Sequence, residues 1–181
     1  DTKRYGDGNL YKFSSDGELK DTYETLTHGG MPGFLGVTAS SMGPDQSKIV
    51  YISELGNRIF QYDVIKNEQA DDLITYAPES GDLVIAITHS TNGDFYSIKA
   101  NFRAGFSLCK HDSSSGNILE QFELPGPGWA SLCIAMDGES AYIGNFFNGT
   151  MGRFNLTNGE MIASAETNVE RSLAGIAQFI G

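Results

Sequence analysis

Short segments with two kinds of hydrophobic pattern alternate along the chain. One kind is apolar on nearly every position and follows a loop that contains Gly or Pro, and strands of this kind belong in the middle of a packed assembly. The other kind alternates apolar and polar residues, as in DDLITYA (71–77) and ILEQFEL (118–124), which is typical of half-exposed edge strands. The first kind occurs four times, as GFLGVTAS (33–40), GDLVIAITH (81–89), GWASLCIAM (128–136) and RSLAGIAQFIG (171–181).

A repeat relates these segments. Tyr51, Tyr96 and Tyr142 follow the first three apolar runs at spacings of 45 and 46 residues. After each Tyr comes a long polar residue, then an aromatic ring, then Asp, Asn or Ser, and then turn dipeptides such as Asn-Gly and Ser-Gly, in which Gly tolerates positive φ. The copies of this second signature are FQYD (60–63), CKHD (109–112), GRFN (152–155) and, near the N-terminus, YKFS (11–14).

Each period therefore holds four short strands: an inner strand A, then B, C and an outer D. Four antiparallel strands in about 45 residues are the blade of a β-propeller. The sequence predicts an all-β fold in one domain, residues 1–181, with complete blades at 34–77, 82–124 and 129–167. It predicts almost no helix.

The run GNRIFQYD (56–63) resembles the NHL-type propeller blade, in which a Gly-Asn-x-x-Tyr strand precedes an Asn-Arg-Ile-x-Lys-Phe-Asp strand. Virginiamycin B lyase and gluconolactonase-like propellers share this general pattern. The resemblance implies the fold but not the function, because one fold hosts many functions. A lactonase of this kind needs a convergent set of carboxylate and Asn ligands for a divalent metal, and the lyase needs a His acid/base. The sequence offers neither set at matching positions.

The flanks do not form a complete blade. Residues 8–26 supply strands C and D, and residues 172–181 supply strand A, but no strand B lies with them. One interpretation is that the chain is part of a longer propeller, with the terminal strand 172–181 covered by a further chain segment or by a partner. The other is a closed four-bladed ring.

Charge and composition narrow the choice of partners. The net charge of −11 disfavours nucleic acid, because an acidic surface repels phosphates. Apolar runs such as LVIAI (83–87) are far shorter than the roughly 20 residues of a membrane-spanning helix, so no membrane insertion is expected. Cys109 and Cys133 lie in apolar strands, which predicts buried free thiols, with one disulfide as the alternative.

Candidate binding residues lie where loops should surround the central channel. Glu54, Lys99 and Asn145 each follow the repeated Tyr by three residues, which predicts part of a ring on the face that carries the D–A and B–C loops. Two histidines and several aromatics are further candidates for the rim or channel, although the aromatics could equally pack between blades: His28, His89, Phe102, Trp129, Phe146 and Phe147. No catalytic group, metal site or cofactor site is predicted, because the three histidines do not cluster and no catalytic triad or phosphate loop is present.

Two sequons, Asn148-Gly-Thr and Asn155-Leu-Thr, favour an extracellular or cell-surface protein. We expect glycan on Asn148, in a B–C loop, more than on Asn155, which aligns with Asp63 at a turn. The sequence thus predicts a non-enzymatic recognition or assembly module that binds protein or carbohydrate on its loop face. The alternative is a propeller enzyme of lactonase or lyase type whose remaining site residues lie in other blades.

Overall fold

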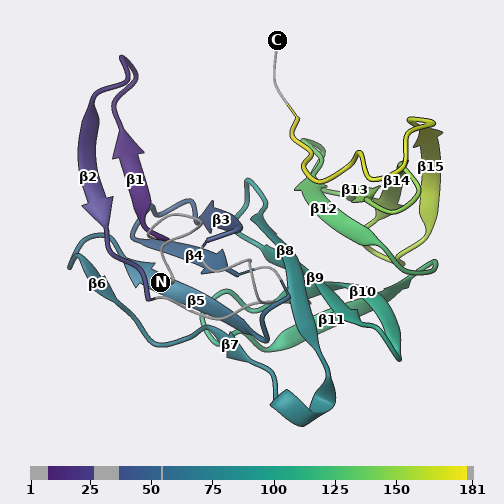
Figure 1. Ribbon diagram of the computed structural model, residues 1–181, viewed down its shortest axis with the longest axis horizontal. Coiled ribbons are helices and arrows are strands. Elements are labelled where there is room, and N and C mark those ends of the chain that lie inside the picture. Colours follow the sequence, from purple (N-terminus) through teal and green to yellow (C-terminus); the bar gives the residue numbers. More distant parts are fainter. Residues whose placement is uncertain (1–7, 27–36, 54, 179–181) are drawn as a thin grey trace.

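The computed structural model describes residues 8–26, 37–53 and 55–178, and the fold is that of a β-propeller built from antiparallel blades (Figure 1). Within these residues, two sheets have four strands, a third has five and a fourth has two. Within the described residues, the only helix is the 3₁₀ turn η1, Pro78–Ser80. The all-β prediction is confirmed. No described helix is long and apolar enough to span a membrane.

Strand order follows the chain in every blade, so each blade is a meander. The two-stranded sheet pairs β1 (Leu10–Phe13) with β2 (Leu19–Tyr23). The first full blade contains β3 (Ala39–Met42), β4 (Lys48–Ile52), β5 (Arg58–Asp63), β6 (Glu68–Gln69) and β7 (Ile74–Thr75). The second contains β8 (Leu83–His89), β9 (Phe95–Asn101), β10 (Gly105–His111) and β11 (Ile118–Leu124). The third contains β12 (Trp129–Ile134), β13 (Ser140–Asn145), β14 (Thr150–Asn155) and β15 (Met161–Glu166).

The last residue of the repeated signature caps the turn between strands C and D. Asp63 Oδ1 accepts hydrogen bonds from the N–H groups of Ile65 and Lys66, at 3.0 and 2.9 Å. Asp112 and Asn155 accept equivalent bonds from the residues two and three positions later. These side chains supply local acceptors for backbone donors at the turn, which explains why the signature ends in Asp or Asn.

The inner strands lie together, and the blades stack face to face. Strand β8 contacts both β3 and β12. An apolar cluster that includes Ile98, Leu108, Trp129 and Ile143 joins the second and third blades, and a smaller one that includes Ile59 and Phe95 joins the first and second. The β1–β2 hairpin packs on the other side of the first blade through Tyr23, whose ring centroid lies 5.5 Å from that of Tyr62.

Two segments depart from the expected pattern. Of the outer strand expected at 71–77, only the short strand β7 forms, and a second short strand, β6, lies before that range. The two pair with different parts of β5. The segment 172–178, expected as a strand A, carries no strand, and residues 179–181 lie outside the described residues. It still runs beside β12, because Ser131 Oγ donates to the Leu173 carbonyl at 3.1 Å and the Met136 N–H donates to Gln178 Oε1 at 3.1 Å.

Candidate functional site

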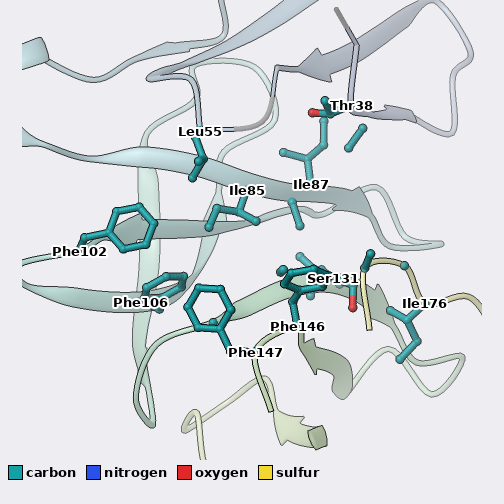
Figure 2. A pocket seen from close by; sticks show the side chains of 17 residues that line it. Thr38, Leu55, Ile85, Ile87, Phe102, Phe106, Ser131, Phe146, Phe147 and Ile176 are labelled. Carbon is teal, nitrogen blue, oxygen red and sulfur yellow. The ribbon is translucent and has the colours of Figure 1, made fainter. Parts of the chain in front are cut away.

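A pocket of about 690 Å³ opens where the inner strands begin, on the face that carries the D–A and B–C loops (Figure 2). Its wall comes from three inner strands, from loops of all three blades and from the segment 172–178. Figure 2 shows the rings of Phe102, Phe106 and Phe147 gathered on one side and Ile176 on the other. Among the described residues that line it, Thr38 and Ser131 carry the only polar side chains.

Those two hydroxyls already have acceptors. Thr38 Oγ1 donates to the Ile52 carbonyl at 3.3 Å, and Ser131 Oγ donates to the Leu173 carbonyl at 3.1 Å. A ligand therefore meets an almost wholly apolar wall of side chains.

Two β-bulges help to make this wall. In β8 the register with β9 shifts between Val84 and Ala86, and in β12 the register with β13 shifts between Trp129 and Ser131. The extra residues are Ile85 and Ala130, and both line the pocket. A bulge breaks the two-residue alternation of a strand and redirects side chains, so consecutive residues of one inner strand can face the same space.

The loop that carries Phe146 and Phe147 is fixed by hydrogen bonds to Asn145, which is only 2% exposed. Its Nδ2 donates to the Pro127 carbonyl at 2.9 Å, and its Oδ1 accepts the N–H of Phe147 at 3.0 Å and that of Asn148 at 3.3 Å. The Phe146 N–H donates to the Gly128 carbonyl at 2.8 Å. These bonds tie the D–A loop to the B–C loop of the same blade.

Gly128 permits this close approach of the two loops. Its φ is +100°, and a Cβ there would lie 2.6 Å from Asn145 Oδ1 and 2.8 Å from the Phe147 ring. Only glycine fits such a position without displacing a pocket residue.

Leu55 reaches the pocket from the first blade with a backbone that is unusual for a bulky residue. Its φ is +57°, in the left-handed region. The Leu55 N–H donates to the Val84 carbonyl at 3.2 Å, and the Val84 N–H donates to the Gly56 carbonyl at 2.8 Å. The loop is therefore bonded to the inner strand of the next blade, and this link places the Leu55 side chain in the pocket.

The residues predicted from the sequence do not all lie in one place. Phe102, 60% exposed, and Phe146 line the pocket. Asn145 lies beneath the pocket and supports it. Trp129 is 2% exposed, packs edge-on against Phe154 at 5.3 Å between centroids, and therefore belongs to the core. Glu54 and His28 lie outside the described residues.

Lys99 and His89 lie away from the pocket. Lys99 Nζ lies 3.9 Å from Asp82 Oδ2, and neither residue lines the pocket. The prediction of a polar ring at a constant offset from Tyr does not hold for Lys99, because the hairpin β9–β10 is longer than β13–β14. Asn101, two residues further along, is the capping residue that matches Asn145, since its Oδ1 accepts the N–H groups of Arg103 and Ala104. His89 lies at the opposite end of β8, where its Nδ1 is 2.9 Å from Ser41 Oγ of the neighbouring blade.

A second Ser–His pair is buried within the second blade. His111, 1% exposed, places Nδ1 3.0 Å from the Gly116 carbonyl and Nε2 2.8 Å from Ser97 Oγ. A carbonyl only accepts, so Nδ1 carries the proton and the Ser97 hydroxyl donates to Nε2. Burial lowers the pKa of His111 and keeps the ring neutral. The His111 ring thus occupies the position that the other copies of the repeat give to an aromatic ring.

Other titratable groups do not gather into a metal site. Among the described residues, no group of three or more His, Cys, Asp or Glu side chains is placed to hold a metal ion. Both cysteines are free, Cys109 buried and Cys133 partly so. The prediction of free thiols is confirmed.

The fold and the pocket together define a β-propeller with an apolar site on its loop face. Among solved structures, the chain is similar to the hydrazine synthase of Kuenenia stuttgartiensis, with a TM-score of 0.60 and 16% sequence identity over 82% of this chain and 40% of that chain. The chain thus spans well under half the length of that protein, and at this identity the likeness concerns the fold. No protein-family model and no curated protein sequence matches the chain.

Proposed function

We propose that this propeller is a recognition module that binds a protein partner by taking apolar side chains of that partner into the pocket. The observation that carries the proposal is the pocket wall. Seventeen of the described residues line it, and the only two polar side chains among these seventeen already bond to backbone carbonyls. Such a wall favours burial of apolar surface, worth about 25 cal/mol per Å².

Exposed aromatic rings at the mouth support the same function. Phe102 and Phe147 are 60% and 51% exposed. Aromatic side chains on a loop face are common anchors in protein interfaces. A carbohydrate could stack on these rings, but its hydroxyl groups would need hydrogen-bond partners that the pocket side chains do not offer. This reasoning favours protein over carbohydrate.

The test selects short random peptides displayed on phage against the protein and measures the best binders by calorimetry. We expect binders enriched in Leu, Ile and Phe. Replacing both rim rings (Phe102→Ala with Phe147→Ala) should weaken binding by about tenfold or more, because each ring contributes to the buried anchor site.

Phe13→Ala is the matched control, since Phe13 on β1 is 59% exposed but does not line the pocket. It should leave the affinity unchanged. Binders that lack apolar residues, or that bind the double variant as tightly as the wild type, would contradict the proposal. Selection of glycans but no peptides on an array would favour the carbohydrate alternative.

Two finer assignments belong to the same proposal. The NHL-type repeat is supported by GNRIFQYD, which forms β5 and the residues before it. An extracellular or cell-surface location is supported by the sequon at Asn148, whose side chain is exposed in the β13–β14 loop. A glycan there would lie beside Phe147, next to the pocket mouth.

A further inference from the structure

Beside the pocket, the segment 174–177 offers backbone groups that nothing in the described part of the chain uses. The three inner strands β3, β8 and β12 each pair with a strand B, namely β4, β9 and β13. The segment runs beside β12 as the next inner strand would. Yet its N–H and C=O groups from 174 to 177 make no hydrogen bond with the described residues.

The space next to this backbone is open. Ala174, Gly175 and Ala177 are exposed, and a Cβ added at Gly175 would meet no atom within 4 Å. Ala174, Gly175 and Ile176 also belong to the pocket wall. One surface therefore combines unpaired backbone donors and acceptors with a large apolar pocket.

This combination matches a known mode of peptide recognition. In β-strand addition, an extended peptide pairs with an exposed strand edge. The main-chain hydrogen bonds supply affinity, and pockets for alternate side chains supply specificity. The pocket side chains offer a ligand almost no polar contact, so the backbone of 174–177 is the natural source of hydrogen bonds.

Resting on the proposed function, we infer that the ligand is an extended segment of a partner protein that adds as a strand to residues 174–177. Every second side chain of that segment is apolar and enters the pocket. The chain carries a net charge of −11, so basic residues at the ends of the segment complement it.

The probe for this inference is the peptide acetyl-Lys-Val-Thr-Leu-Thr-Phe-Thr-Val-Lys-amide. Two further forms carry N-methyl groups on the backbone. One form is methylated at both Val residues, the Leu and the Phe, and the other at the three Thr residues. Successive amides of a strand point to opposite sides, so each set blocks one edge of the peptide and leaves the side chains intact.

We expect the unmodified peptide to bind and one methylated form to bind at least tenfold more weakly. The other form should bind within about threefold of the unmodified peptide. In ¹⁵N-labelled protein, binding should slow hydrogen exchange at amides within 174–177. The amides of β15, an exposed strand at the outer edge of the third blade, serve as the control and should not change.

The outcomes separate the two proposals. If both methylated forms bind as well as the parent, and all binding still requires Phe102 and Phe147, strand addition is wrong and apolar recognition stands. If no form binds, or if replacing Phe102 and Phe147 by Ala leaves the affinity unchanged, the proposed function fails as well. If the protein alone sediments as a dimer with amides 174–177 already protected, the occupant is a second copy and the inference is overturned.

Discussion

Asn145 offers the sharpest test of how the pocket loop is held. Asn145→Ala removes the side chain that accepts the Phe147 N–H and donates to the Pro127 carbonyl. The side chain also accepts the Asn148 N–H, so the variant loses three hydrogen bonds. Each is worth about 0.5–1.5 kcal/mol net, and the free energy of unfolding should therefore fall by about 2–4 kcal/mol.

The assay is thermal and urea unfolding of wild type and variant. For a domain of this size each kcal/mol shifts the melting temperature by about 2–4 °C, so a fall of about 10 °C is expected. Asn148→Ala is the control from the same loop. Its exposed side chain accepts one bond, from the Thr150 N–H at 3.0 Å, and its loss should change stability by about 0.5 kcal/mol or less.

The result that would refute the reasoning is an Asn145→Ala protein within about 0.5 kcal/mol of the wild type. The loop would then be held by its own turn and by its aromatic packing. Peptide affinity gives a second readout, because loosening of the loop should weaken pocket binding even at temperatures where the variant is fully folded.

Three further predictions address the rest of the molecule. Burial lowers the pKa of His111, so the folded state binds fewer protons than the unfolded state and stability should fall as the pH drops below about 6.5. Urea unfolding at pH 7.5 and 5.5 should show a smaller loss of stability in His111→Phe than in wild type. An equal loss of stability would contradict the assignment. Gly159→Ala should destabilise the protein by about 2 kcal/mol more than Gly138→Ala. Both glycines have φ near +70°, but only a Cβ at 159 meets another residue, at 2.5 Å from Phe122 Cβ. Equal unfolding curves for the two variants would contradict this, because they would mean that Phe122 moves aside at no cost in stability. Intact mass of natively sourced protein, with and without glycosidase, should reveal a glycan on Asn148, and no change in mass would remove the main support for secretion.

The repeat of Tyr51, Tyr96 and Tyr142 was enough to predict the blades, because strand alternation and turn dipeptides act locally and recur. The pocket was harder to predict. The bulges at Ile85 and Ala130 cannot be recognised within an apolar run. An extra residue changes which side chains face the channel, but the run remains apolar throughout. No offset from Tyr could identify both Asn101 and Asn145, because the hairpins that they cap differ in length.

Trp129 shows the limit of assigning aromatics to loops. In PGPGWAS it follows glycines and prolines, which predicted a position on the rim. In the structure it is the first residue of β12, and its indole N–H donates to the Pro125 carbonyl at 3.2 Å while the ring is buried against the third blade. The segment 172–178 has the apolar composition of an inner strand, but composition cannot supply the neighbouring strand that pairing requires.

The unequal contacts between blades have a consequence for how the molecule comes apart. In an array of repeats, stability is approximately a sum of terms for each unit and for each pair of neighbours. The second and third blades share the larger apolar cluster, whereas the boundary between the first and second blades is joined by a smaller one. Under gentle pulling or mild denaturant, the N-terminal part should detach first, and blades two and three should persist as a pair. Since Leu55 and Thr38 belong to the first blade, the pocket should open before the molecule loses most of its structure.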